Sequence, residues 1–444
     1  MLRAGFGMAD ITPALGAELK GYNTKRFASG VLDPLHVRAF VLDGEATRLA
    51  VLVFDLMAVE RAQTEAIRAH LSRTLGLPGG SVIVSTTHTH TAPVVFKFFD
   101  GAPAPGYIEN TLLPAAEQAC REALASAGPF TLRFGRAVEH GLAFCRRYVM
   151  KGGAVVTNPP KGSEEIDRPE SEIDHNVQVL AFERDGEPAG LLVNANNHSD
   201  TIGGDKVSAD WLAWMARALG EHFRRPVPVM LLNGPEGNIN HYDPDNPVQQ
   251  ISYEECERVG RGYARFVIEA LEGAEPVSTD PVKALSEIVE VPYRRVSQED
   301  VERASEVAQN RPDTTGQTIT ANDLPKGHPY WTWIIAKGIV EFDRKYGGLE
   351  GESVELCGFR MGECAFVGLP GEPFSGIGMG IKSGSPFERT CVFALCGDMG
   401  GYIPMPQDFV RGGYEPLTTA YNRFAPEAAE LFIEGALKLL AALK

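Results

Sequence analysis

Residues 81–93 read SVIVSTTHTHTAP, a β-branched strand that ends in a polar segment with two histidines. Side chains alternate between the faces of a strand, so we expect His88 and His90 to point the same way. Two imidazoles on one face at a strand end suit a divalent metal or a proton-transfer pair. Taken alone, the pair is more typical of a polar strand end whose histidines form hydrogen bonds with their neighbours. The choice between this interpretation and a functional site depends on the rest of the chain.

The segments around this stretch mix hairpins with helices. One predicted hairpin turns at Asp43-Gly44 and a second at Asp185-Gly186. Hairpins in place of strict strand–helix–strand alternation favour an α/β (α+β mixed) fold, with large mixed β-sheets and flanking helices. The expected strands are 37–42, 49–54, 81–84, 177–182, 190–194, 227–232, 288–293, 353–360 and 363–368, and the expected helices are 58–75, 109–126, 210–223, 252–271, 298–310, 330–346 and 426–443.

Composition narrows the class of protein. The 444 residues are 44% hydrophobic and 23% charged, as in an ordinary globular protein. The net charge of −16 argues against nucleic acid as a partner, and no apolar run is long enough for membrane insertion. Seven scattered cysteines without a C-x-x-C pair fit reduced thiols in a cytoplasmic protein. We expect a small-molecule substrate. The composition is also compatible with a homo-oligomer.

Apolar strands repeatedly run out into loops with polar or metal-capable side chains. Besides the histidine run, such exits occur at 194–200, 233–241, 369–373 and 396–402. Ligand sites gather at strand ends in open sheets, so five exits favour one shared site. Each residue also has a simple structural explanation: Glu372 could offset a helix dipole, His198 could bond to backbone, and Tyr402 could pack. The acids Asp200, Asp205 and Asp210 could hold a second metal, but loop and helix-start roles explain them better.

Three motifs in order resemble a known family. They are the opening AGFGMADITP at 4–13, Gly21-Tyr22, and the run THTHTAP at 87–93. Together they are similar to the neutral/alkaline non-lysosomal ceramidases. The loop LPGEP at 369–373 and the tyrosines Tyr402 and Tyr414 match the late motifs of the family, and the resemblance extends to about Ala420.

The resemblance implies one zinc ion per chain and a set of residues around it. The implied metal ligands are His88, His198, Glu372 and Tyr402. The implied catalytic residues are His90, Arg146, Tyr414 and Asn240, although Cys145 stands where the family usually has asparagine before the arginine. Zinc lowers the pKa of a bound water to about 7, and this water could attack an amide carbonyl. His90, Tyr414 or Arg146 would then stabilise the oxyanion or protonate the leaving amine.

Three departures from the family narrow the expected activity. At 237–241 the chain reads GNINH in place of G-D-x-S-P, so Asn240 replaces a serine and cannot act as a hydroxyl nucleophile. We expect one ceramidase-like catalytic domain over 1–444, without a secretion signal or a C-terminal immunoglobulin-like domain, and with a subdomain boundary near 273–283. The segment 96–107 is richer in aromatics than the glycine-rich family pattern, which disfavours a long-chain lipid.

The sequence therefore predicts a zinc-dependent amidohydrolase that acts on C–N bonds other than peptide bonds. The expected substrate is a small soluble compound with an N-acyl or cyclic amide bond. A metal-dependent ester or lactone hydrolase, a true ceramidase and a non-catalytic ligand-binding homologue remain as alternatives.

Overall fold

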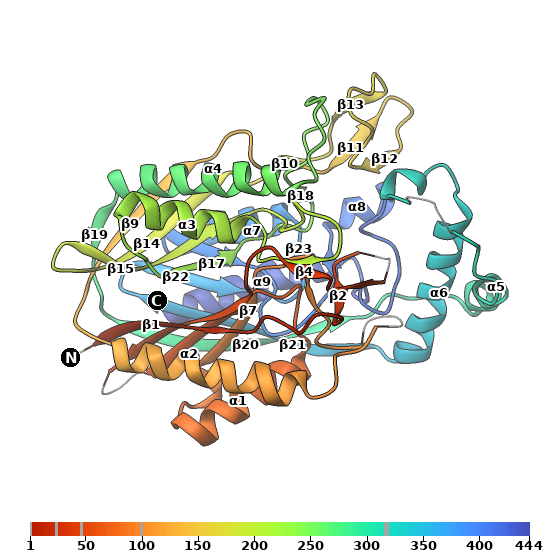
Figure 1. Cartoon of the computed structure of the whole chain (residues 1–444). Coiled ribbons are helices and arrows are strands. Elements are labelled where there is room, and N and C mark those ends of the chain that lie inside the picture. Colours follow the sequence, from red (N-terminus) through yellow and green to blue (C-terminus); the bar gives the residue numbers. More distant parts are fainter. Residues whose placement is uncertain (1, 23–24, 45–47, 98–100, 315–318) are drawn as a thin grey trace.

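Three sheets of four or five strands surround a shared interior in the computed structural model, which describes residues 2–22, 25–44, 48–97, 101–314 and 319–444. Helices cover the outer faces of these sheets (Figure 1). Each sheet combines antiparallel pairs with one parallel pair. The predicted α/β class, with large mixed sheets and flanking helices, is confirmed.

The three sheets repeat one chain order. Three antiparallel strands are followed by a helix, by a strand parallel to the third, and by a second helix. The first unit is β1 (Arg3–Asp10), β5 (His36–Asp43), β6 (Arg48–Phe54), α1 (Arg61–Leu75), β7 (Val82–Thr86) and α2 (Leu113–Ser126). The second is β9 (Thr131–Val138), β14 (Asn176–Arg184), β15 (Glu187–Ala195), α3 (Trp211–Phe223), β17 (Val229–Asn233) and α4 (Tyr253–Glu272). The third is β20 (Val282–Pro292), β21 (Gly351–Met361), β22 (Cys364–Gly368), α7 (Ser375–Gly384), β24 (Arg389–Phe393) and α9 (Ala428–Leu443).

Strands in these units are buried on both faces. Along β5, Phe40 and Leu42 face the shared interior, whereas Ala39 and Val41 pack beneath α1 and α2. Phe182 of the second unit and Phe359 of the third reach the same interior. Because neither face meets water, the strands read as continuous apolar runs without alternation.

Glycines let each helix lie directly on its sheet. A Cβ atom on Gly5 of β1 would stand 1.9 Å from the carbonyl oxygen of Ala123 in α2. One on Gly135 of β9 would stand 1.8 Å from the carbonyl oxygen of Ala270 in α4. The glycines of the N-terminal motif therefore serve packing, because only a residue without a side chain permits this approach.

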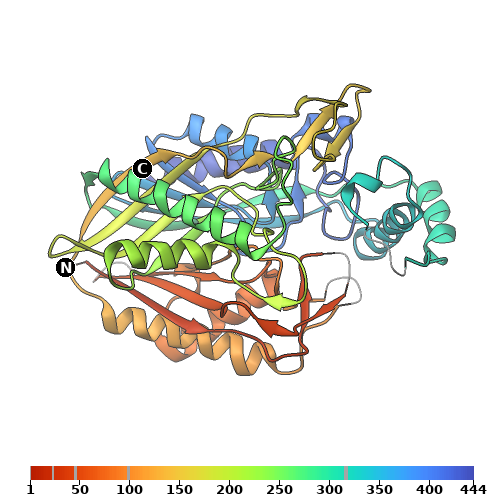
Figure 2. The same cartoon turned by 45° about the horizontal axis from the view of Figure 1, so that its top comes forward.

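Shorter strands and helices connect the elements of the three units (Figure 2). α5 (Gln298–Ala308) and α6 (Pro329–Tyr346) form a helix pair at one end of the molecule. The remaining strands are β2 (Glu18–Lys20), β3 (Arg26–Phe27), β4 (Gly30–Val31), β8 (Ala92–Pro93), β10 (Phe144–Cys145), β11 (Arg147–Met150), β12 (Val155–Thr157), β13 (Ile166–Pro169), β16 (Lys206–Val207), β18 (Ile239–Asn240), β19 (Glu275–Val277), β23 (Glu372–Pro373) and β25 (Tyr402–Ile403). The remaining helices are α8 (Pro406–Arg411) and the short turns η1 (Gly79–Ser81), η2 (Ile108–Leu112) and η3 (Ala321–Asp323).

The segment predicted as a linker, 273–283, is partly structured. It contains β19, which pairs with β9, and the first residues of β20. A subdomain boundary there stays a prediction. The seven cysteines are buried and free, and among the described residues no helix is both long and apolar enough to cross a membrane. At the start of the aromatic-rich segment 96–107, Phe96 and the preceding Val95 pack into the core under α1 and α2, while residues 98–100 lie outside the described residues.

Candidate metal centre and pocket

Loops from all three units meet where the parallel strand pairs end. His88 follows β7, His198 follows β15, and Glu372 follows β22. His88, Glu372 and Tyr402 line one pocket with a volume of about 90 Å³. The strand exits of the sequence thus converge because each unit points the carboxyl ends of its parallel pair toward the same place.

His88 lies in the loop that follows the strand and not in the strand itself. β7 ends at Thr86, and His88 has a φ of 66°, in the left-handed region that residues with a side chain rarely adopt. The prediction that strand alternation aligns His88 and His90 is therefore wrong. Their rings still approach, with centroids 4.9 Å apart, because this backbone conformation brings both imidazoles to the same side of the loop. Such backbone strain is typical of functional sites.

The tautomers of His88 and His198 are set by backbone carbonyls. Nδ1 of His88 donates to the carbonyl oxygen of Met57 at 2.7 Å, and Nδ1 of His198 donates to that of Glu236 at 3.0 Å. A neutral imidazole that donates from Nδ1 carries its lone pair on Nε2. Both Nε2 atoms face the same oxygen, Oε2 of Glu372, at 3.2 Å and 3.3 Å.

This arrangement fits a divalent metal. Zn–N and Zn–O bonds of about 2.0–2.1 Å in a tetrahedron place neighbouring ligand atoms roughly 3.3–3.4 Å apart, close to the two contacts with Glu372. Burial lowers the pKa of His88, but the Glu372 carboxylate outweighs it and raises that pKa to about 9. Burial likewise opposes ionisation of Glu372, yet His88 and His198 hold its pKa well below the usual range. Positive charge is therefore favoured between these side chains.

His90 joins the same cluster. A ligand atom of His90 lies within 4.8 Å of those of His88 and His198, and its Nδ1 is buried without a hydrogen-bond partner among the described residues. Burial and the neighbouring His88 push the pKa of His90 well below its ordinary value, so the ring is neutral. A neutral imidazole here can accept a proton or bind a metal, and the catalytic role implied by the resemblance stays a prediction.

Tyr402 is placed by its pairing with Glu372. The two residues are register partners in the parallel pair β23–β25, so their side chains emerge side by side. The ring of Tyr402 lies 5.0 Å from the guanidinium carbon of Arg146 and 5.8 Å from the ring of Tyr414. Burial raises the pKa of Tyr414 to about 12, which keeps its hydroxyl protonated as a hydrogen-bond donor. Both tyrosines line the pocket, and the roles implied by the resemblance, Tyr402 as a metal ligand and Tyr414 as a catalytic residue, stay predictions.

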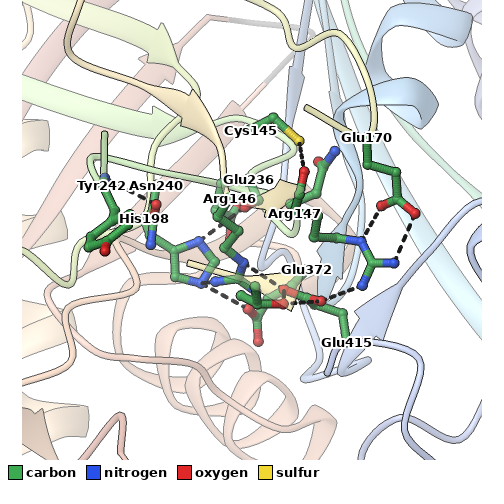
Figure 3. Close-up of polar contacts among 12 residues, drawn as sticks. Cys145, Arg146, Arg147, Glu170, His198, Glu236, Asn240, Tyr242, Glu372 and Glu415 are labelled. Atoms are coloured by element: carbon green, nitrogen blue, oxygen red, sulfur yellow. Dashed lines mark hydrogen bonds and ion pairs between the residues drawn. The ribbon is translucent and has the colours of Figure 1, made fainter. Parts of the chain in front are cut away.

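Arg146 connects the histidine cluster to a buried ion-pair network (Figure 3). Its Nη1 lies 3.0 Å from Nε2 of His198, and its Nε donates to Glu415 at 2.9 Å. Glu415 also accepts from Arg147, which forms a second ion pair with Glu170. Glu415 was not predicted from the sequence, although its position next to Tyr414 was a usable signal.

Asn240 is placed differently from the other predicted residues. It pairs with Phe144 between β10 and β18, and its side-chain oxygen accepts from the backbone N–H of Tyr242 at 3.1 Å. Asn240 is not among the residues that line the pocket. The acids considered for a second metal also have local partners: Asp210 caps α3, and Asp200 lies 3.2 Å from Nδ1 of His241. Asp205 is exposed.

Comparisons with known proteins show what the sequence and the fold are similar to. Residues 2–213 match the family described as neutral/alkaline non-lysosomal ceramidase, N-terminal. The fold matches a crystal structure of the neutral ceramidase from Pseudomonas aeruginosa, with a TM-score of 0.73, 16% identity, and coverage of 100% of this chain and 75% of that one. A structure described as a ceramidase complexed with C2 matches with a TM-score of 0.72 and 17% identity. This match covers 100% of this chain and 76% of that one. No curated protein matches the sequence.

The chain therefore shares its fold with the neutral ceramidase structures. The resemblance found in its motifs is confirmed over residues 2–213, which match the N-terminal domain described for that family.

Proposed function

We propose that the protein is a zinc-dependent hydrolase that cleaves an amide bond in a small soluble substrate. The observation that carries the proposal is the contact of two Nε2 atoms, from His88 and His198, with one oxygen of Glu372 at 3.2 and 3.3 Å. Imidazole nitrogens and a carboxylate oxygen form a common ligand set of catalytic zinc. Tyr402, the register partner of Glu372, would complete this set.

A bound divalent metal would supply a Lewis acid and an activated water at this place. The chain's own residues would do the rest. Arg146 Nη1 points at His198 Nε2, so a cation on that lone pair would free this N–H for the carbonyl oxygen of a substrate. Tyr414 would donate its hydroxyl to the same oxygen, and neutral His90 would take a proton and return it to the leaving amine.

The size of the pocket supports a small substrate. Its volume of about 90 Å³ is well below the roughly 300–1,000 Å³ of sites for drug-sized ligands. Trp331 and Ile334 of α6 and Leu417 form its apolar wall. A short acyl group or a small cyclic amide fits this space better than a long lipid chain, because burying such a chain requires a longer apolar channel.

The test is hydrolysis of paired substrates before and after removal of metal. Purified protein is assayed on N-acetyl, N-hexanoyl and N-palmitoyl amides and on the matching esters, then treated with a chelator and reloaded with Zn²⁺. We expect short amides to be cleaved at least tenfold faster than long ones, with activity lost on chelation and restored by Zn²⁺. Activity that survives complete removal of metal would overturn the mechanism, and faster cleavage of the esters would assign the alternative ester hydrolase.

A further inference from the structure

A second buried carboxylate, that of Glu236, lies beside the candidate metal ligands His88 and Glu372. Its side chain is fully buried, and neither Oε1 nor Oε2 has a hydrogen-bond partner among the described residues. An oxygen of Glu236 lies within 4.8 Å of ligand atoms of both His88 and Glu372. Burying a carboxyl group without a hydrogen-bond partner is costly, so this placement points to a binding partner for the group.

The backbone holds Glu236 in this place. Its loop follows β17 and touches β23, where Gly237 N–H donates to the carbonyl oxygen of Pro373 at 3.0 Å. A Cβ atom on Gly237 would stand 2.3 Å from the carbonyl oxygen of Glu372, so only glycine permits the approach. The carbonyl oxygen of Glu236 also orients His198. The main chain of Glu236 therefore orients a candidate ligand, and its side chain lies beside two others.

Packing alone does not explain why the carboxyl group of Glu236 is buried here. Glu415, the other fully buried glutamate of the region, contacts two guanidinium groups, whereas Glu236 faces a second carboxylate, that of Glu372. Two carboxylates that approach each other in a water-free interior cannot both stay ionised unless a cation lies between them. A divalent metal supplies that charge, and carboxylate oxygens are suitable ligands for it.

We propose that Glu236 is an additional ligand of the metal held by His88, His198 and Glu372, which makes this a two-carboxylate centre. This inference rests on the proposed metal site and adds to its ligand set. Two carboxylates neutralise the charge of a divalent ion and add a hard oxygen donor to the imidazoles. Such a set would suit Mn²⁺ and Co²⁺ as well as Zn²⁺.

The test compares metal binding by the full chain and its variants, without an activity assay. Wild type, Glu236→Gln and Glu236→Asp are stripped of metal and titrated with Zn²⁺, Mn²⁺ and Co²⁺ by calorimetry. We expect both variants to bind Zn²⁺ at least tenfold more weakly and to lose Mn²⁺ binding most, because Gln removes the anionic oxygen and Asp withdraws it by one methylene. In the Co²⁺ protein, Glu236→Gln should intensify the visible bands as the coordination number falls.

A matched control is Glu139→Gln, which changes a buried glutamate that accepts from the backbone N–H of Leu142. It should leave metal affinity and the Co²⁺ spectrum unchanged. Zn²⁺ affinity within threefold of wild type in both Glu236 variants, with an unaltered Co²⁺ spectrum, would overturn the inference. If the wild type itself bound no metal, the proposed function would fail as well, so the two failures are distinguishable. Thermal unfolding of the stripped variants verifies that each is folded.

Discussion

Nε2 of His88 lies 3.2 Å from Oε2 of Glu372, and this contact joins the first structural unit to the third. Nε2 of His198, from the second unit, reaches the same oxygen at 3.3 Å. The candidate centre therefore lies where all three units meet, and no unit alone could build it. Because the ligands come from different sheets, their spacing depends on the shared core and should respond to changes in any unit.

Removal of His88 or Glu372 should abolish metal binding. Wild type is expected to hold close to one Zn²⁺ per chain, whereas His88→Ala and Glu372→Gln should retain less than a tenth of it. The reason is that each substitution removes one of three directly facing ligand atoms. Metal content measured by mass spectrometry checks this, with His222→Ala, an exposed histidine of α3, as the control. Full occupancy in both ligand variants would contradict the assignment.

Substitution of His90 should separate catalysis from metal binding. If His90 moves protons, as we predict, His90→Asn keeps its metal while kcat falls by about 10²–10⁴, the usual contribution of a general acid–base group. Metal content and steady-state kinetics on the best short amide measure both quantities. The contrary result is a loss of metal in parallel with activity, and it would make His90 a third imidazole ligand instead.

Glu415 should position Arg146. In Glu415→Gln the guanidinium of Arg146 loses its charged partner, so we expect kcat to fall at least tenfold and unfolding free energy to drop by about 3–5 kcal/mol. Glu170→Gln is the matched control, because it removes a partner of Arg147 and leaves the contact of Arg146 with Glu415 intact. It should lower stability in urea titrations but not kcat. Equal losses of kcat in both variants would refute a specific positioning role.

Asp408 should make stability depend on pH. Burial and the nearby Glu170 raise the pKa of Asp408 from 3.8 to about 6, so the native state binds more protons than the unfolded state between these values. The free energy of unfolding therefore falls as pH rises through this window. The loss is complete above about pH 6, where Asp408 is ionised in both states. Asp408→Asn should therefore stabilise the protein at pH 8 by roughly 1–3 kcal/mol and by nothing at pH 4.

The control for this measurement is Asp300→Asn. Asp300 accepts from Ser297 and Arg303, which hold its pKa below the ordinary value, so its ionised form is favoured in the native state. Its substitution should give no gain at pH 8. Thermal unfolding at both pH values provides the comparison, and a stabilisation of Asp408→Asn that is as large at pH 4 as at pH 8 would rule out the electrostatic cause.

Much of the fold could be predicted from apolar patterns. The hairpin 177–182 and 190–194 lies within β14 and β15, and the helix expected at 210–223 is α3 to within one residue. These elements are long and apolar, so local pattern specifies them. The threefold repetition of the units escaped detection, because loops of different length separate equivalent strands and similar burial is reached with different side chains.

The sequence by itself determined the elements, the mixed class and which strand exits carry metal-capable groups, because local spacing and motif order record these directly. Only the tertiary structure decided which groups meet. It placed His88 in a left-handed loop conformation where a strand was expected, kept Asn240 out of the pocket lining, and brought Glu236 into the cluster. The physical reason is that distances across three sheets depend on how helices and glycines seat each sheet on the shared core, and no short segment contains that information.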